Sequence, residues 1–352
     1  MEEKKEIQLT IINNIAKATE EEFLNILKLV APGTNLRIAI DGIIKIGKGA
    51  LIVIENEHLF PLLDGGFYLG CRFTPQRVME LSKMDGAIIL SKDIKRINYA
   101  NVTLMPDSRI KTNETGTRHK AAERTAKQIG GLAIAISERR KEVSLFYKNI
   151  KYNLKDIEDI LQKANSNLQI LEKQRELFDE YIRKLNKSEF KGVPSLHLAV
   201  NTIQKGRIMQ KIFNELKKTI IEAGNEGILQ KLRLKEILTG IERETNLIIK
   251  DYSKIGYKRS KTLIDSLTYE ELTEEKKLER ALGYEEESEI ILKGWRILSK
   301  TSLTEAEIAM LIKEIGTLKK ILEVGSIHEL LLGEERALQF KKEIEKIRTD
   351  NF

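Results

Sequence analysis

The stretch Asp85-Gly86-Ala87-Ile88-Ile89-Leu90 places an acidic turn directly before a short apolar run. Such a run, preceded by turn residues, is typical of a buried β-strand. About thirty residues later the sequence reads Thr115-Gly116-Thr117-Arg118-His119-Lys120-Ala121-Ala122-Glu123-Arg124. This second stretch predicts a glycine-containing loop that leads into a helix, with two cations and a histidine in its first turn. We treat the two stretches as parts of one site.

The predicted helix start is suited to an anion. Its first backbone N–H groups have no partner within the helix, and the helix dipole favours negative charge there. Arg118 and Lys120 oppose that dipole unless an anion such as phosphate lies between them. Asp85 would then supply the carboxylate that a divalent metal needs. An ordinary turn and a solvated helix end have the same residues, so spacing alone leaves both interpretations open.

The two stretches together resemble a known signature. Asp85-Gly86-Ala87, followed by Thr117-Arg118-His119 and a basic residue, is similar to the Asp-Gly-Ala and Arg-His-Arg elements of the diadenylate cyclase family. The resemblance runs from about Leu36 to Tyr147. It includes the segments Gly49-Ala50-Leu51-Ile52-Val53 and Leu63-Asp64-Gly65-Gly66-Phe67. The whole chain resembles the bacterial members of this family that scan DNA integrity.

Length and composition favour a soluble protein of two or three domains. The chain has 352 residues, of which 41% are hydrophobic and 32% charged, and its formal net charge is +7. This excess of positive charge suits nucleotides or nucleic acid as partners. We expect no membrane association and no signal peptide, because no apolar run approaches twenty residues and Met1-Glu2-Glu3-Lys4-Lys5 precedes no apolar segment. The single cysteine, Cys71, fits a reducing cytoplasm.

The first part of the chain alternates between helical and strand patterns. Helices are expected over 7–30, after the N-cap candidate Thr34, after Thr74-Pro75, and from Thr117 to the glycine pair Gly130-Gly131. The expected strands are 50–54, 88–90, 102–105, 132–136 and 143–147, the last two pairing across the charged turn 138–142. Residues 1–149 are therefore predicted to form an α/β domain with a mixed central sheet, which the resemblance identifies as a diadenylate cyclase domain.

The middle of the chain changes to a heptad-like pattern. Apolar residues recur in steps of three and four at Leu154, Ile157, Leu161, Ala164, Leu168 and Leu171, and again, after a break at Arg175, at Phe178, Ile182 and Leu185. This pattern predicts a long helix packed on other helices. Gly192-Val193-Pro194 interrupts it, and further helices are expected over 196–223 and 226–249. We predict an all-helical spine over 150–285.

The last part, 286–352, is expected to consist of short helices, one of them capped by Thr304. The stretch Ile327–Ala337 resembles the helix-hairpin-helix module, whose glycine-rich hairpin lets backbone N–H groups approach DNA phosphates. The module usually has two hairpin glycines, but here Leu331 stands in the first place and only Gly333 remains. Gly333, Lys341 and Lys342 are the DNA-binding candidates.

The resemblance also implies a reaction. Members of the family join two ATP molecules into cyclic di-3′,5′-AMP and release two pyrophosphates, with one ATP on each of two facing domains. Asp85 is then the catalytic residue, which binds Mg²⁺ or Mn²⁺ and activates the 3′-hydroxyl. The residues implied in nucleotide binding are Gly86, Ala87, Leu104, Thr117, Arg118, His119, Lys120, Ala121, Ser137 and Arg140.

Two residues depart from the family pattern. Lys120 replaces the second arginine of the Arg-His-Arg element, which keeps the charge but loses the bidentate fork. Glu138 stands where the family often has arginine, so a contact to the triphosphate is expected to be missing.

The resemblance further implies a homo-octamer in the cytoplasm, associated with the nucleoid, in which branched DNA regulates the cyclase. An alternative is a non-enzymatic architectural DNA-binding protein that has kept a nucleotide pocket for regulation. A third interpretation, a structural coiled-coil protein with an unrelated α/β head, leaves the paired motifs unexplained.

Overall fold

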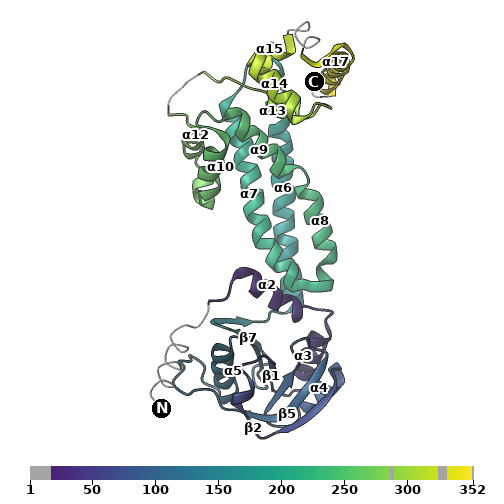
Figure 1. Cartoon of the computed structure of the whole chain (residues 1–352), viewed down its shortest axis with the longest axis vertical. Helices are drawn as coiled ribbons and strands as arrows, with labels where there is room; N and C mark the ends of the chain where they lie inside the picture. Colours follow the sequence, from purple (N-terminus) through teal and green to yellow (C-terminus); the bar gives the residue numbers. More distant parts are fainter. Residues whose placement is uncertain (1–16, 286–288, 324–330, 351–352) are drawn as a thin grey trace. The chain divides into compact units, whose positions relative to one another are not determined.

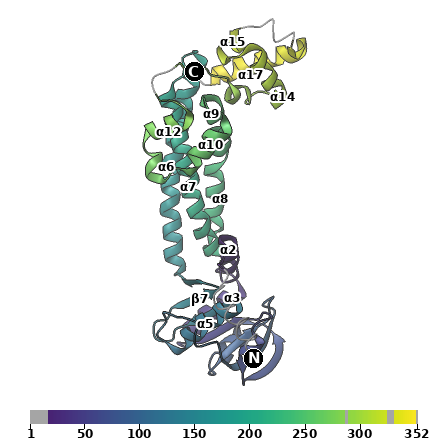
Figure 2. The ribbon, with the colours of Figure 1, turned by 60° about the vertical axis from the view of Figure 1, so that its left-hand side comes forward.

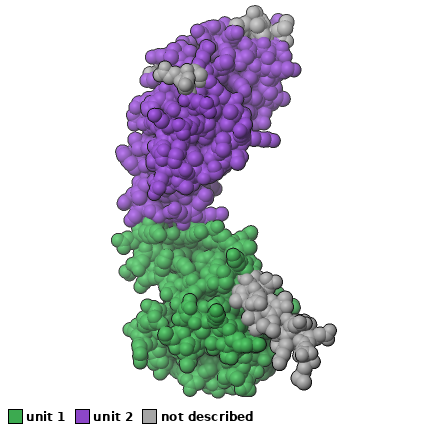
Figure 3. Space-filling view, turned by 90° about the vertical axis from the view of Figure 1, so that its left-hand side faces the viewer, with its two compact units in different colours: residues 1–164, 218–229 green, residues 165–217, 230–352 purple. Residues whose placement is uncertain are grey.

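A computed structural model describes residues 17–285, 289–323 and 331–350 of the chain (Figure 1). The chain divides into two compact units (Figure 3). Unit 1 comprises residues 1–164 and 218–229, and unit 2 comprises residues 165–217 and 230–352. No helix in the described ranges has the length and apolarity needed to cross a membrane.

Unit 1 is built on a mixed β-sheet, as predicted. Its strands are β1 (Ala50–Ile54), β2 (Leu63–Asp64), β3 (Phe67–Arg72), β4 (Ala87–Leu90), β5 (Arg96–Leu104), β6 (Leu132–Ile136), β7 (Val143–Tyr147) and β8 (Ile150–Asn153). The strand order is β2-β5-β4-β1-β6-β7-β8, and β3 also pairs with β5. Among the described pairs, β1 and β4 run parallel and the others antiparallel.

Helices cover both faces of this sheet (Figure 1). The helix α5 (Thr117–Ile129) packs on one face, where its Ala122 and Ala126 meet Leu51 and Val53 of β1. The opposite face carries α2 (Glu20–Leu29), α3 (Asn35–Lys45) and α4 (Pro75–Leu81). Because neighbouring residues of a strand point to opposite faces, the short apolar strands contribute to both cores.

Local capping chemistry sets the helix boundaries. Thr34 and Thr74 accept backbone hydrogen bonds at the starts of α3 and α4, and Gly130 ends α5 in a left-handed conformation, all as predicted. The helix predicted over 7–30 is described only from Glu20. Residues 17–19 are not helical, because Thr19 forms a capping box with Glu22 and fixes the helix start there. Residues 7–16 lie outside the described ranges.

Three strands escaped the sequence pattern, namely the two-residue β2 and the longer β3 and β8. β3 and β8 are edge strands with few buried side chains, so they lack an apolar run. β8 pairs with β7 and extends the sheet to Asn153, beyond the boundary expected at residue 149. The strand expected over 102–105 also begins earlier, at Arg96. Several residues in its first half are polar, so the sequence shows no apolar run there although buried and exposed side chains alternate.

Long helices make up the middle of the chain (Figure 2). The helix α6 (Ile157–Phe190) confirms the predicted heptad-like segment, and Ala164, Leu168 and Leu171 are fully buried. It is followed by α7 (Leu196–Ala223), the 3₁₀ turn η2 (Gly224–Gly227), α8 (Ile228–Leu238) and α9 (Ile241–Tyr252). The single helix predicted over 226–249 is wrong, because Gly240 has a φ of 80° and separates α8 from α9.

Arg175, which breaks the apolar series of α6, has a structural role. Its guanidinium donates to the carbonyl oxygens of Ile237 and Thr239 at 2.7 and 3.0 Å, at the end of α8. The last carbonyl groups of a helix have no intrahelical partner, and a cation there also complements the dipole. Arg175 therefore holds α8 against α6.

Short helices complete unit 2. They are α10 (Tyr257–Ser266), α11 (Tyr269–Leu272), α12 (Glu275–Leu282), α13 (Trp295–Leu298), α14 (Glu305–Ile315), α15 (Leu318–Glu323) and α17 (Glu334–Asp350). Thr304 caps α14 in a capping box with Glu307, as predicted. Part of the expected DNA-binding hairpin, Ile327–Leu330, lies outside the described residues.

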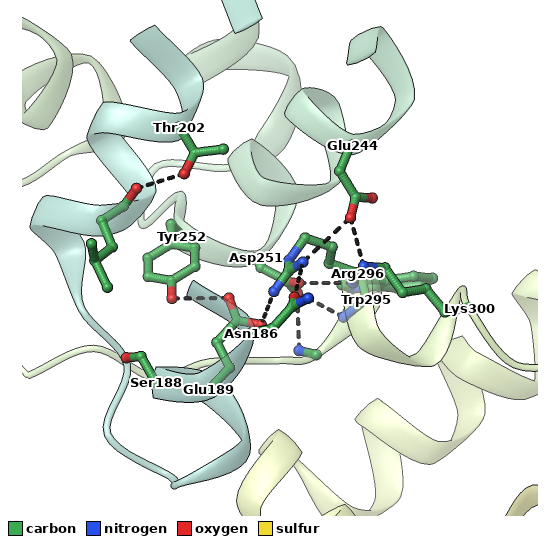
Figure 4. A network of polar contacts seen from close by, with 12 residues as sticks. Asn186, Ser188, Glu189, Thr202, Glu244, Asp251, Tyr252, Trp295, Arg296 and Lys300 are labelled. Atoms are coloured by element: carbon green, nitrogen blue, oxygen red, sulfur yellow. Dashed lines mark hydrogen bonds and ion pairs between the residues drawn. The ribbon is translucent and has the colours of Figure 1, made fainter. Parts of the chain in front are cut away.

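A buried polar network ties α13 to α6 and α9 within unit 2 (Figure 4). Arg296 is fully buried, and its guanidinium bonds Glu189 at 2.5 Å, Asn186 at 2.6 Å and Glu244 at 3.3 Å. The carboxylate of Asp251 accepts three backbone N–H groups at the start of α13, from Gly294, Trp295 and Arg296. This network joins the C-terminal helices to the helical spine by charge-assisted hydrogen bonds.

Candidate nucleotide site

The strand pairing brings the predicted residues to one edge of the sheet. Ala87 of β4 lies beside Leu51 of β1, and Ala50 lies opposite Ile136 of β6. Ala87 also lies opposite Val102 of β5. The beginnings of β1 and β4 therefore share an edge with the ends of β5 and β6. Asp85, Leu104 and Ser137, which adjoin these ends, converge there although no two of them are neighbours in sequence.

Asp85 and Gly86 form an exposed turn at this edge. The Asp85 side chain has no hydrogen bond or ion pair with any residue that the structure describes. Gly86 has a φ of 86°, and a Cβ there would lie 2.7 Å from the backbone carbon of Asn101 and 2.9 Å from the nitrogen of Val102. Only glycine fits this close approach between the turn and β5. The fold thus presents the carboxylate of Asp85 outward with its acceptor oxygens unused.

The start of α5 is also open. Gly116 is its N-cap residue, no side-chain hydrogen bond caps it, and its first turn contains no acidic residue. The guanidinium of Arg118 lies against Gly49, where any Cβ would collide with it. Gly49 and Asp85 each stand two residues before the pair Leu51–Ala87, which begins the parallel ladder of β1 and β4. Arg118 and Asp85 therefore belong to the same edge of the sheet.

His119 is buried beside this helix start. Its ring packs edge-to-face on Phe146 of β7, with 6.4 Å between the ring centroids. Burial lowers the pKa of His119; Glu114 partly offsets this effect, and the positive charges of Arg140 and Lys151 add to it. The imidazole is therefore neutral at physiological pH, with one nitrogen able to donate and one able to accept a hydrogen bond.

Ser137 and Arg140 lie in the tight turn between β6 and β7. The hydroxyl oxygen of Ser137 accepts the N–H of Arg140 at 3.2 Å, and the Arg140 side chain lies 3.5 Å from Glu142. Glu138, which was expected to remove a contact to the triphosphate, lies 3.8 Å from Lys48, with both side chains half exposed. An exposed pair at this distance is weak, so it fixes neither side chain strongly.

The apolar candidates belong to the core. Ala87 is fully buried, and Leu104 is 8% exposed in the cluster beneath α5. Ala121 is partly buried against the same cluster. Ala87 therefore offers a ligand its backbone and not its side chain, whereas Leu104 keeps a small exposed surface at the end of β5.

The residues at the candidate site could hold a divalent metal ion only together with a bound ligand. The described residues contain no group of three or more histidine, cysteine or acidic side chains placed to hold a metal ion. Asp85 is instead a lone exposed carboxylate. Mg²⁺ is commonly held by one or two carboxylates together with substrate phosphates, since it keeps most of its other ligands as water. The site thus suits a metal that arrives with a nucleotide.

A hollow of about 430 Å³ lies at the opposite edge of the sheet. It is lined by Glu55, His58, Phe60 and Lys92, which follow the ends of β1 and β4. The residues of the predicted site adjoin the beginnings of the same strands. The hollow is therefore separate from the candidate nucleotide site.

The DNA-binding candidates lie in α17 and just before it. Gly333 has a φ of 84°, and a Cβ there would meet no atom within 4 Å. Lys341 lines a hollow with Lys319 and Arg348, whereas Lys342 is exposed on α17. Gly333 therefore serves the backbone turn into α17.

The sequence alone did not reveal why Gly49 matters. Gly49 belongs to a segment that resembles the family, but its contact with Arg118 depends on how β1 and α5 meet in space. The groups that hold the loop before α5 were also missed. The only sequence signal for these groups is the spacing of polar residues along one side of α5.

Two family models match the chain. The first, described as DisA bacterial checkpoint controller nucleotide-binding, matches residues 37–150. The second, described as DisA bacterial checkpoint controller linker region, matches residues 154–291. The nucleotide-binding match contains Asp85 and the whole of α5, and so coincides with the candidate site.

Several curated proteins are similar over almost their full length. The DNA integrity scanning protein DisA of Clostridium acetobutylicum is 37% identical over 350 residues, which cover 96% of this chain and 98% of that protein. The DisA protein of Clostridium perfringens is 39% identical over 341 residues, covering 94% of this chain and 96% of that protein.

These matches span both units and decide between the interpretations. The non-enzymatic alternative is set aside, because the site-bearing segment is a diadenylate cyclase domain in sequence as well as in its paired motifs. The chain belongs to the DisA family of DNA integrity scanning proteins and is a diadenylate cyclase.

Proposed function

We propose that each protomer binds one ATP at the sheet edge around Asp85 and that two facing protomers condense their ATP molecules into cyclic di-3′,5′-AMP and two pyrophosphates. One observation carries this proposal above the others. Asp85 and Gly49 each stand two residues before the pair Ala87–Leu51 that begins the ladder of β4 and β1, and the guanidinium of Arg118 lies against Gly49. The Asp85 carboxylate has no partner among the described residues. An acidic group and a fixed cation at an open helix start are what a metal–phosphate ligand needs.

The bound nucleotide lies across this edge, and the chemistry of the residues there assigns each of them to the adenine, the ribose or the phosphates. Adenine meets the exposed part of Leu104, and Gly86 and Ala87 approach the ribose through their backbone. The phosphates meet the open start of α5, where unpaired N–H groups and two cations converge. The phosphate contacts are Thr117, Arg118, His119, Lys120 and Ala121, with Ser137 and Arg140 further out.

Neutral His119 suits this arrangement. A protonated imidazole would add positive charge beneath the helix start, whereas the neutral ring donates a single hydrogen bond in a fixed direction. Lys120 supplies charge without a bidentate geometry. The site therefore neutralises the phosphates mainly through Arg118, Lys120 and the helix dipole.

Asp85 would hold Mg²⁺ or Mn²⁺, which supplies charge neutralisation at the α-phosphate and lowers the pKa of the 3′-hydroxyl. The oxygen of that hydroxyl attacks the α-phosphorus of the ATP held by the facing protomer. The bond from that phosphorus to the bridging oxygen breaks, and pyrophosphate leaves. The same exchange in the other direction closes the ring.

This chemistry requires association, because one chain supplies only half of the reacting groups. In-line positioning of two bound nucleotides replaces a bimolecular encounter and accounts for much of the rate gain. The full assembly is a homo-octamer. Activity per protomer therefore falls when the protein is diluted below the dissociation constant of the assembly.

The C-terminal segment 286–352 is proposed to bind branched DNA through phosphate contacts at Gly333, Lys341 and Lys342, and so to regulate the cyclase. The helical segment up to residue 285 separates the two functions. Its boundary with the cyclase domain follows Asn153, because β8 belongs to the sheet. Such a protein works in the cytoplasm, at the nucleoid.

An ATP analogue tests the reaction directly. Purified protein is incubated with Mn²⁺ and ATP, with Mn²⁺ and 3′-deoxy-ATP alone, or with both nucleotides, and the products are separated by chromatography and identified by mass spectrometry. ATP should give one cyclic di-AMP for every two pyrophosphates. The 3′-deoxy analogue should inhibit this reaction and give no cyclic product. A linear or cyclic product from the analogue would rule out attack by the 3′-hydroxyl.

A further inference from the structure

Residues 105–116 connect the two ends of the candidate nucleotide site without forming a helix or strand. The loop starts directly after Leu104, the adenine-side contact, and ends at Thr117, where α5 begins. Loops of this length without secondary structure are uncommon in compact domains and often functional. This loop therefore joins the proposed adenine contact to the proposed phosphate contacts.

The polar side of α5 holds this loop. Gln128 accepts the N–H of Asp107 at 2.8 Å, and Arg124 donates to the carbonyl oxygen of Ile110 at 3.0 Å. Lys127 donates to the carbonyl oxygen of Lys111 at 2.9 Å. The helical residues involved lie one turn apart on the side away from the sheet. The loop is therefore attached to the helix through its backbone at successive points.

Glu123 is the centre of this attachment. Its side chain is 12% exposed, and its carboxylate accepts the hydroxyl of Thr112 and the ammonium of Lys127, the latter at 2.6 Å. The N–H of Asn113 also bonds it. Burial acts to raise the pKa of Glu123, but the hydrogen bonds from Lys127 and Thr112 outweigh it and hold the pKa below its usual range. The carboxylate is therefore ionised at neutral pH.

Thr112 extends the chain of contacts beyond Glu123. Its hydroxyl oxygen accepts the N–H of Glu114 at 3.1 Å while its proton goes to Glu123. The carboxylate of Glu114 in turn lies 2.5 Å from the ammonium of Lys151 on β8, with only 9% of the Glu114 side chain exposed. The loop is thus pinned between α5 and the sheet by one continuous network.

We propose that Glu123 is a positioning residue, which acts through Thr112 and Lys127 to fix the loop between the adenine and phosphate contacts before ATP arrives. This inference rests on the proposed nucleotide site. A loop that is already ordered has no conformational entropy left to lose on binding, so ATP binds more tightly than it would to a mobile loop. None of these three residues is among the proposed contacts to ATP.

The pair Thr112→Val and Thr112→Ser tests the proposal. Valine has the shape of threonine but lacks the hydroxyl, whereas serine keeps it. With ATP and Mn²⁺, Thr112→Val should raise the KM for ATP about tenfold and lower kcat less than threefold, because the loss is one of binding. Thr112→Ser should stay within about twofold of the wild type in both. Glu80→Gln, in the exposed pair with Lys83, is the matched control and should change neither.

Hydrogen–deuterium exchange of the full-length protein without nucleotide gives a second readout that needs no activity. Thr112→Val should exchange faster in the loop than wild type and Thr112→Ser, with the strands unchanged. Unchanged loop exchange or an unchanged KM in Thr112→Val overturns the inference, as does an equal defect in Thr112→Ser. A wild-type protein that makes no cyclic di-AMP overturns the proposed reaction instead, and the exchange result then still decides whether the loop is held.

Discussion

Replacing Arg296 by methionine should destabilise unit 2 strongly. Arg296 is fully buried, and its guanidinium is the cation that pairs with the fully buried Glu189. Methionine keeps much of the apolar volume but leaves that carboxylate without a counter-charge. Figure 4 shows that the other acidic partners keep further contacts. Glu244 retains the ammonium of Lys300 at 2.7 Å, and Asp251 retains its backbone donors.

The expected cost therefore comes from one orphaned carboxylate. Removing one partner of a buried ion pair costs about 3–5 kcal/mol. For a unit of this size, each kcal/mol lowers the Tm by about 2–4 °C, which gives a fall of about 6–20 °C for the transition of unit 2. The hydroxyl of Tyr252 still donates to Glu189 at 3.0 Å and keeps the cost toward the lower end.

Calorimetry of the full-length protein measures this effect. Arg233→Met is the matched control, because Arg233 pairs with Glu172 on the surface of unit 2 with both side chains about half exposed. Losing such a pair costs at most about 1 kcal/mol. The double variant Arg296→Met with Glu189→Leu should recover part of the loss, since the orphaned carboxylate of Glu189 is then gone. Equal Tm values for Arg296→Met and Arg233→Met would refute the reasoning.

Three further outcomes follow from the structure. Burial, reinforced by the charge of Glu189, raises the pKa of Asp251 to about 7, so between about pH 4 and pH 7 the native protein binds a proton that the unfolded chain has lost. The free energy of unfolding measured in urea should therefore fall as the pH rises from about 4 to 7. The same dependence of the unfolding free energy on pH in Asp251→Asn would contradict this. Gly86→Ala should lower cyclase turnover about a hundredfold, because its Cβ pushes the Asp85 turn off β5, and near-wild-type turnover would argue against that placement. Lys341→Glu with Lys342→Glu should weaken binding of branched DNA in a fluorescence anisotropy titration and reduce its salt dependence, whereas unchanged affinity would remove α17 from the interface.

Much of unit 1 follows from local sequence patterns. The runs at 50–54 and 132–136 are apolar enough to be recognised as buried strands, and Thr34, Thr74 and Gly130 mark helix ends by chemistry that acts within a few residues. The half-exposed edge strands β3 and β8 have no such pattern, because an edge strand is held largely by backbone pairing. Strand order, which brings the start of β4 beside the start of β1, is likewise not determined by any single segment.

The polar networks could not be predicted from the sequence either, because their members come together only in the folded chain. Glu189 and Arg296 are 107 positions apart, and each resembles an ordinary surface residue on a charged helix. Only the packing of α6 against α13 removes both from water. The contacts of Glu123 with the loop before α5 depend similarly on how that loop turns back along the helix. The motif residues of the site were recognised from the sequence, but the groups that hold them in place were not.

The central claim is that Asp85 activates the 3′-hydroxyl at an assembled pair of nucleotide sites. Its most direct test compares wild type with Asp85→Asn in Mn²⁺ and ATP, with cyclic di-AMP measured by chromatography and assembly by analytical ultracentrifugation. Wild type should form cyclic di-AMP, whereas Asp85→Asn should form none while sedimenting as the same oligomer. Synthesis by Asp85→Asn at the wild-type rate would contradict the account.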